Sequence, residues 1–297
     1  MREVFKGACT ALITPMTEGG AVDYDAFARL IDFQLENGID ALLACGTTGE
    51  PPTLSEDERA GVIEFTVKRA AGRVPVLAGT GGNNTAAAVL AGKRAQNLGA
   101  SALLVVTPYY NKATQGGLVA HYRAIAEGAE LPVILYNVPG RTGVNLLPRT
   151  VEELCEVPNI AGLKEAGGNM EQICDAARRT AGKIALYSGD DSLNLPVLSV
   201  GGSGCISVLS NILPAQTHEL CKLYFEGDTQ GARQLFLSMF NLARAVFCEV
   251  NPIPIKAAAW LLGLCQPYLR LPLTPIEPQN LELLKREMLA FGLSINQ

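Results

Sequence analysis

The sequence predicts a (β/α)8 barrel of the TIM type with a C-terminal helical extension. Eight short apolar runs recur between residues 7 and 210, and helix-like segments separate them. The runs are almost continuously apolar rather than alternating, which is typical of strands buried on both faces of a parallel sheet. Strands that alternate regularly with helices favour such a sheet, and eight β/α units close a barrel.

The eight predicted strands span residues 7–16, 38–46, 75–81, 102–110, 131–138, 160–166, 184–190 and 204–210. A doubly wound open sheet is the alternative architecture. It usually has fewer strands, and a glycine-rich phosphate turn follows its first strand. The first run here ends in LITPMTEGG, which is not a G-x-G-x-x-G turn, so the barrel is favoured.

Helix-capping residues support the segments between the strands. Asp23 is an N-cap for a helix over 24–36, and Ser55 with Glu58 three residues later forms a capping box for a helix over 56–71. A further helix is predicted to follow Asn84 and Thr85 and to run to Leu98, and the others are predicted over 115–128, 148–156, 169–180, 192–200 and 215–225.

The last 72 residues add three predicted helices, near 228–247, 253–264 and 278–291, with prolines between them. This stretch is too short and too apolar on one face for a free domain. We therefore expect a catalytic barrel over 1–225 and a helical appendage over 226–297, packed on the barrel or at a subunit contact.

Composition excludes several classes of function. The chain of 297 residues is 48% hydrophobic with a net charge of −5, which is not the composition of a disordered protein. A pI near 5.2 gives no general attraction to nucleic acid. No run of apolar residues is long enough to span a membrane, and the N-terminus lacks the apolar core of a signal peptide. We expect a cytoplasmic protein.

Cysteine and histidine usage argues against a metal or redox centre. No two of the eight cysteines are closer than sixteen residues, and there are two histidines, His121 and His218. This leaves no zinc or iron–sulfur spacing and makes a Ser–His–Asp triad hard to build. We expect buried, reduced thiols and no metal or cofactor.

The ends of the predicted strands carry the polar side chains. In a barrel of this kind, active sites lie at the carboxyl ends of the strands. Strand ends here include GTTGE at 46–50, TPYYN at 107–111, YNVPGRTG at 136–143 and SGDD at 188–191. Hydroxyls, a guanidinium and carboxylates therefore meet on one rim, together with the lysine of the sixth strand.

Lys164 is the most informative of these residues, because it lies inside the otherwise apolar strand IAGLKEA. Burial favours the neutral form of an amine, and a neutral amine is a nucleophile toward carbonyls. The alternative is a strand-end lysine that reaches water or pairs with Glu165.

Neighbouring strand ends hold partners for this chemistry. A phenol such as Tyr136 can move protons while a carbinolamine forms and loses water, although it also suits a core position. The Thr47 and Thr48 turn is able to hold a carboxylate through hydroxyls and backbone N–H groups, or simply to begin a helix. Arg141 matches a second carboxylate bidentately, or lies on the surface.

Asp190 and Asp191 have no histidine nearby, so a capping or hydrogen-bonding role is favoured over metal binding.

Three motifs together, GTTGE, YNVPGRTG and GLKEA at 162–166, resemble the signatures of the pyruvate-dependent class I aldolase and lyase family. The resemblance extends over the whole chain and includes the helical tail. It implies a lyase that joins pyruvate to L-aspartate 4-semialdehyde through a lysine Schiff base, an early step of diaminopimelate and lysine biosynthesis. N-Acetylneuraminate lyase and 2-keto-3-deoxy sugar acid aldolases are the alternative within the family.

The resemblance also implies roles for single residues. Lys164 would form the Schiff base and Tyr136 would be the general acid and base. Thr47 would link Tyr136 to Tyr110, a residue that in this family commonly reaches in from a neighbouring subunit of a homotetramer, a dimer of dimers.

Four further residues would bind the substrates. Thr48 and the backbone of Ile206 would hold the carboxylate of pyruvate, Arg141 would hold that of the semialdehyde, and Gly189 would line the pocket. The arginine and the double threonine favour the condensation of pyruvate with the semialdehyde over the reactions of the sugar-acid lyases.

One departure concerns feedback inhibition by lysine. Family members inhibited by lysine bind it with histidine and glutamate side chains at the tight dimer interface. Those positions are Glu56, Arg59 and Ala87 here, whereas Asn83 and Tyr109 are retained. We expect weak or absent inhibition.

Overall fold

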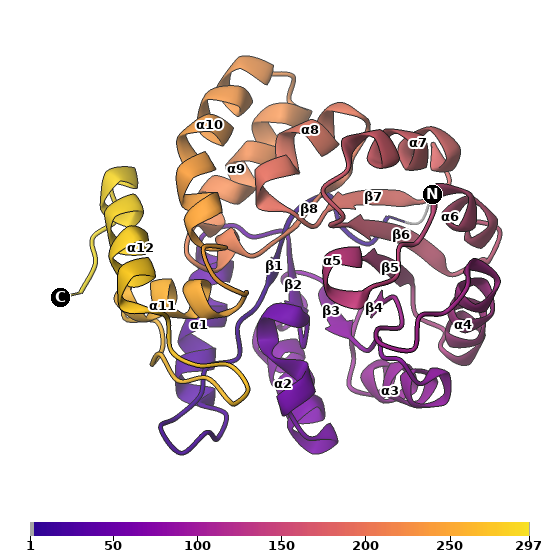
Figure 1. Ribbon diagram of the computed structural model, residues 1–297, viewed down its shortest axis with the longest axis horizontal. Helices are drawn as coiled ribbons and strands as arrows, with labels where there is room; N and C mark the ends of the chain where they lie inside the picture. The colour runs from indigo at the N-terminus through magenta and orange to yellow at the C-terminus, as the bar shows by residue number, and fades with distance from the viewer. Residues whose placement is uncertain (1–2, 297) are drawn as a thin grey trace.

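The computed structural model describes residues 3–296 and contains one closed barrel of eight parallel strands in sequence order (Figure 1). The strands are β1 Gly7–Ala11, β2 Ala41–Ala44, β3 Val76–Gly79, β4 Ala102–Val106, β5 Val133–Asn137, β6 Ile160–Glu165, β7 Ala185–Ser188 and β8 Gly204–Ser207. Each lies inside a predicted run, so the predicted (β/α)8 barrel is confirmed. The first run extends past its strand because residues 12–16 of the following loop are buried too.

Helices surround the barrel, as Figure 1 shows. They are α1 Tyr24–Glu36, α2 Glu56–Ala70, α3 Thr85–Asn97, α4 Gln115–Gly128, α6 Pro148–Leu154, α7 Met170–Thr180, α8 Asn194–Ser199 and α9 Pro214–Phe225. The Asp23 side chain accepts a hydrogen bond from the Ala26 N–H, and Ser55 with Glu58 forms the predicted capping box. Every predicted barrel helix is therefore confirmed.

Several short helices at the strand ends were not predicted. They are α5 Pro139–Thr142 and the 3-10 helices η1 Thr47–Gly49, η2 Pro51–Thr53, η3 Asp191–Leu193 and η4 Leu209–Asn211. Segments of three or four residues are too short to show a hydrophobic period. They shape the rim on which the polar strand-end residues lie.

Two apolar layers hold the barrel together. One fills its interior, where the rings of Phe5 and Tyr187 stack with centroids 4.3 Å apart. The larger layer lies between the strands and the helices and includes Leu12, Phe27 and Leu103. This double burial explains why the strands are apolar on both faces.

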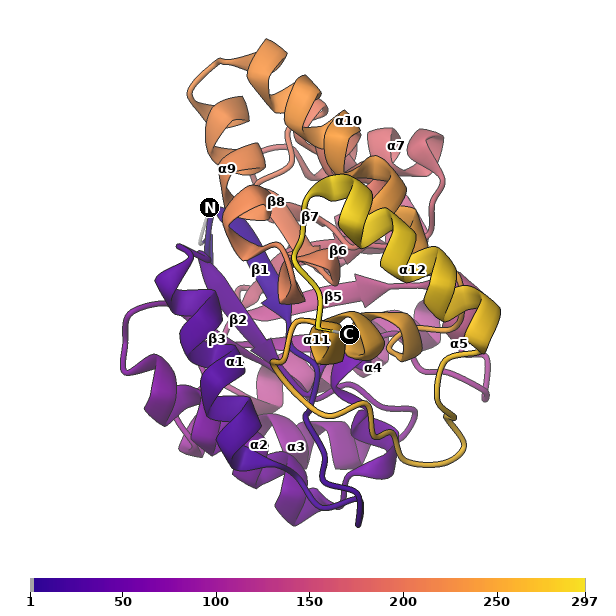
Figure 2. The same ribbon diagram turned by 90° about the vertical axis from the view of Figure 1, so that its left-hand side faces the viewer.

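The tail forms α10 Thr229–Ala245, α11 Ile253–Leu261 and α12 Pro278–Phe291. Helix α10 packs on α8 and α9, α11 contacts η4, and α12 lies against α10 and α11 (Figure 2). The tail therefore covers the side of the barrel where η3 and η4 follow the strands. The division of the chain at residue 225 stays a prediction.

All eight cysteines are free thiols. Five are buried, Cys155 and Cys248 are partly buried, and Cys174 is exposed on α7. The prediction of buried thiols is therefore wrong for Cys174, because the expectation came from apolar runs and Cys174 lies on a polar helix. Between residues 3 and 296, no helix has both the length and the apolar character that a membrane crossing requires.

Candidate active site

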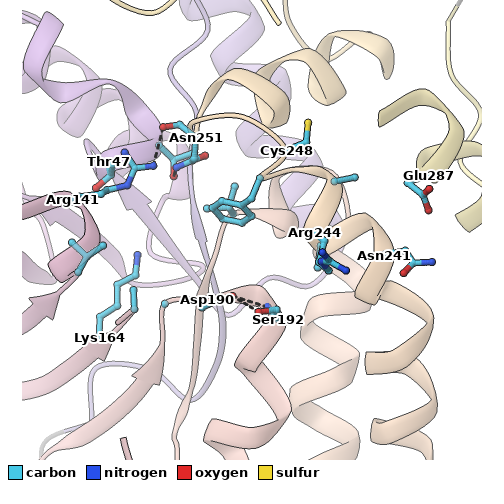
Figure 3. A pocket seen from close by; sticks show the side chains of 18 of the residues that line it. Thr47, Arg141, Lys164, Asp190, Ser192, Asn241, Arg244, Cys248, Asn251 and Glu287 are labelled. Carbon is cyan, nitrogen blue, oxygen red and sulfur yellow. Dashed lines mark hydrogen bonds between the residues drawn. The ribbon is translucent and has the colours of Figure 1, made fainter. Parts of the chain in front are cut away.

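A cavity of about 740 Å³ opens at the carboxyl ends of the strands (Figure 3). Its wall combines barrel loops with the tail helices α10 and α12. Six of the predicted site residues line it: Thr47, Thr48, Tyr136, Arg141, Lys164 and Gly189. These six residues therefore lie together at the strand ends, and their roles stay predictions.

Lys164 lies on β6 with 5% of its surface exposed. Its Nζ atom is 4.4 Å from the centroid of the Tyr136 ring. Among residues 3–296 it has no hydrogen-bond or ion-pair partner. Strand register explains the ring contact, because Lys164 on β6 pairs with Tyr136 on β5. The cavity thus presents a buried amine that is free to react, with a phenol beside it.

Glu165 does not pair with Lys164, so that alternative is wrong. Adjacent side chains of a strand point to opposite faces. The Glu165 carboxylate instead accepts hydrogen bonds from Asn137 Nδ2 at 2.9 and 3.1 Å, from the Gly167 N–H at 2.7 Å and from Gln172 Nε2 at 3.3 Å. Burial raises the pKa of Glu165, against the effect of these donors.

The two threonines occupy the turn that follows β2. Thr48 is buried, and its hydroxyl accepts a hydrogen bond of 3.1 Å from Asn251 Nδ2. That leaves the Thr48 hydroxyl proton available for an acceptor. Thr47 begins the 3-10 helix and lines the cavity with its neighbour. A turn of this kind suits a small carboxylate.

Arg141 and Gly189 shape the mouth and the floor of the cavity. Arg141 is exposed on α5, and its Nη2 atom donates to the backbone carbonyl of Asn251 at 3.1 Å. Gly189 lies against Lys164, and a Cβ atom placed there would be 2.8 Å from Lys164 Cε. A larger residue at 189 would therefore displace the amine.

Two predicted site residues do not line the cavity of their own chain. Tyr110 is 88% exposed in the loop after β4 and has a φ of +73°. Ile206 is buried in β8, paired with Cys9 of β1, although Val208 two residues later does line the cavity. The proton relay through Thr47 and Tyr110 is thus incomplete within one chain.

Asp190 and Asp191 act as hydrogen-bond acceptors, as predicted. Asp190 Oδ1 accepts from the Ser192 N–H at 2.9 Å, and Asp191 Oδ2 accepts from the Val208 and Leu209 N–H groups at 2.9 Å each. Burial raises the pKa of Asp191, while these donors oppose the rise. Over the described residues there is no group of three or more acidic, histidine or cysteine side chains placed to hold a metal.

Sequence reasoning missed the contribution of the tail. Asn251 lies between α10 and α11, is 5% exposed, and touches both Thr48 and Arg141. Arg244 of α10 and Glu287 of α12 also line the cavity (Figure 3). The prolines around Asn251 indicated only a break between helices, so no signal connected this segment with the site.

A second cavity of about 510 Å³ adjoins the first, since Thr47, Tyr136 and Arg141 line both. Its wall includes all five positions that the family resemblance assigns to lysine binding: Glu56, Arg59, Asn83, Ala87 and Tyr109. The Arg59 guanidinium donates through Nε to the Pro51 carbonyl at 2.9 Å.

We expect this second cavity to bind L-lysine weakly or not at all. Lysine carries two ammonium groups, which need acceptors. Glu56 offers one carboxylate, but Arg59 brings a positive charge and Ala87 offers no polar side-chain atom. A calorimetric titration should show no saturation at micromolar lysine, and turnover should be unaffected there. Micromolar binding would contradict this prediction.

Comparisons with known proteins agree with this geometry. Residues 4–290 match the model of the dihydrodipicolinate synthetase family. A 4-hydroxy-tetrahydrodipicolinate synthase of Caldicellulosiruptor bescii is 47% identical over 294 residues, which is 99% of each chain. Two solved structures are also similar over nearly the whole chain. The dihydrodipicolinate synthase of Aquifex aeolicus has a TM-score of 0.96 with 45% identity, covering 99% of this chain and 100% of that one.

The second is the chloride-inhibited dihydrodipicolinate synthase of Acinetobacter baumannii in complex with pyruvate, with a TM-score of 0.95 and 44% identity. It covers 97% of this chain and 99% of its own. Family model, full-length relatives and solved structures thus agree with the three motifs, and the chain belongs to the dihydrodipicolinate synthetase family.

Proposed function

We propose that this chain is a lyase that condenses pyruvate with L-aspartate 4-semialdehyde to give 4-hydroxy-tetrahydrodipicolinate. The observation that carries the proposal is Lys164, a buried amine without a protein partner that faces a cavity beside Tyr136. Family membership supports the choice of substrates. The reaction belongs to diaminopimelate and lysine biosynthesis.

The first half of the reaction activates pyruvate. The Lys164 amine adds to the C2 carbonyl, and the carbinolamine loses water to give a Schiff base. Tyr136 supplies and accepts the protons of these steps, since its ring lies against the amine. Loss of a proton from C3 then gives an enamine, whose C3 is the nucleophile of the second half.

The second half joins the substrates. The enamine carbon attacks the aldehyde carbon of the semialdehyde, whose oxygen takes up a proton. The substrate amine then attacks C2 and displaces Lys164, which closes the ring and regenerates the enzyme. Arg141 at the mouth holds the semialdehyde carboxylate, while Thr48 holds that of pyruvate.

We infer that a homotetramer in the cytoplasm, built from two tight dimers, is the working form. The exposed Tyr110 supports this, because an aromatic residue in a rim loop is well placed to enter the site of a neighbouring copy. It would then complete the relay Tyr136–Thr47–Tyr110. A preparation that sediments as a monomer and turns over at full rate would contradict this inference.

Parallel assays test the substrate assignment. In one assay the enzyme is incubated with pyruvate and L-aspartate 4-semialdehyde, and in the other with N-acetylneuraminate alone. Turnover is measured in each. We expect turnover with the semialdehyde and none with the sugar acid, because Arg141 and the double threonine suit a short charged aldehyde. Faster turnover of the sugar acid would assign the chain to the sugar-acid lyases instead.

A further inference from the structure

A second buried lysine lies outside the cavity and is fully paired. Lys256 of α11 and Glu50 of the turn after β2 form an ion pair in which both side chains are 0% exposed. Lys256 Nζ also donates to the Tyr268 carbonyl at 2.8 Å, and the second Glu50 oxygen accepts from the Arg270 N–H at 3.2 Å. Two tail residues, Lys256 and Arg270, therefore contact one carboxylate of the barrel rim.

Lys256 is unsuited to carbonyl chemistry. Its amine has a carboxylate and a carbonyl as partners, and it does not line the large cavity. Lys164, by contrast, lines the cavity and has no such partner among residues 3–296. A buried charge pair of this type is costly to break, because removal of one partner leaves the other charge uncompensated. The pair is thus a strong and rigid connection between α11 and the turn.

Glu50 holds a conformation that its residue type does not favour. Its φ of 56° and ψ of 40° are left-handed, a region where glycine costs less than any residue with a Cβ. Strained backbone of this kind persists where tertiary contacts fix it, and it gathers at functional sites. Here the contacts are Lys256 and Arg270, and the strained residue directly follows Thr47-Thr48-Gly49.

The same tail segment reaches the site at a second point. Asn251, five positions before Lys256, donates to the Thr48 hydroxyl at 3.1 Å and accepts from Arg141 Nη2 at 3.1 Å. Figure 3 shows Asn251 beside Thr47 and Arg141, above Lys164. Residues 251–256 thus contact the turn for one substrate carboxylate and the arginine for the other.

We propose that Glu50 and Lys256 are positioning residues that set the Thr47–Thr48 turn at the distance from Lys164 that pyruvate requires. They touch no substrate and act through the turn. The proposal rests on the proposed function, because the turn is assigned there to the pyruvate carboxylate. On this proposal the tail is part of the catalytic structure, whereas the sequence pattern predicted only an appendage.

The test separates positioning from stability. Glu50→Gln and Lys256→Met each leave one buried partner, and both should lower the midpoint of thermal unfolding. The double variant removes both charges and should recover most of that loss. We expect its kcat/KM for pyruvate to stay at least about tenfold below wild type, mainly through KM, because a neutral pair no longer fixes the turn.

A conservative variant keeps the proposal testable if the double variant does not fold. Glu50→Asp retains both charges but is shorter by one methylene, so the turn must move toward Lys256. We expect a raised KM for pyruvate and slower borohydride trapping at low pyruvate. Glu58→Gln is the matched control, since Glu58 pairs with Arg270 of the same tail without contacting the turn, and its kinetics should equal wild type.

Two outcomes would overturn the proposal: a stable double variant with wild-type kcat/KM, or Glu50→Asp with wild-type KM. Either is distinct from a failure of the proposed function. If wild-type enzyme itself gave no pyruvate adduct after borohydride reduction, the Schiff-base assignment would fall first. If wild type forms the adduct and the variants match its rate, only the positioning role is lost.

Discussion

Lys164→Ala is expected to abolish the pyruvate adduct and nearly all turnover. Wild-type enzyme incubated with pyruvate and reduced with borohydride should gain the mass of one reduced adduct on Lys164, and the variant should gain none. Removal of a covalent nucleophile costs at least about 10⁴-fold in rate, or roughly 5.5 kcal/mol of barrier. Intact-protein mass spectrometry followed by peptide mapping measures the adduct and its position.

The same variant should fold normally. Lys164 has no hydrogen-bond or ion-pair partner within residues 3–296, so its removal leaves no buried group unsatisfied. Lys256→Ala provides the contrast, because it leaves Glu50 buried without its cation and should cost about 3–5 kcal/mol of stability. Lys164→Ala should therefore lose activity at unchanged stability, whereas Lys256→Ala should lower the midpoint of thermal unfolding.

An adduct that persists in Lys164→Ala would contradict the assignment. Its peptide map would then identify the reacting amine. Lys256 is the only other lysine among the described residues with a buried side chain, so an adduct there would show that its ion pair opens in solution.

The fold could be predicted almost completely from the sequence, for a physical reason. Strands buried on both faces must be apolar throughout, and their helices need caps, so Asp23 and Ser55 indicated helix starts that the structure has. Elements without a period escaped prediction, such as the one-turn helix α5 around Arg141. Short turns are fixed by contacts with distant residues rather than by local pattern.

Some residues of the site could be predicted from the sequence and others could not, for the same reason. Residues at strand ends could be located because the barrel brings all carboxyl ends to one rim, so Lys164 and Tyr136 were predicted and lie together. The position of Asn251 could not be predicted, since its hydrogen bond to Thr48 joins residues 203 positions apart. The pattern of α10 also does not determine the path of the loop that follows it. Tyr110 is exposed on its own chain, and the sequence of one chain cannot place a neighbouring copy beside it.

Arg141→Ala is expected to separate the two halves of the reaction. The pyruvate adduct on Lys164 should form at the wild-type rate, because Arg141 lies at the mouth on α5 and does not contact the amine. Turnover with the semialdehyde should fall by roughly 10²- to 10⁴-fold, because two charge-assisted hydrogen bonds worth about 1.5–3 kcal/mol each are lost. Adduct formation and turnover with the semialdehyde are measured on the same enzyme preparation.

Arg141→Lys is the informative companion, because it keeps the charge and loses the planar, bidentate donor. The guanidinium is oriented by the Asn251 carbonyl at 3.1 Å, a contact that an ammonium on a shorter stem does not reproduce in the same geometry. Activity should therefore recover only in part. Normal turnover in Arg141→Ala would refute its carboxylate-binding role, whereas loss of the pyruvate adduct would place Arg141 in the first half of the reaction.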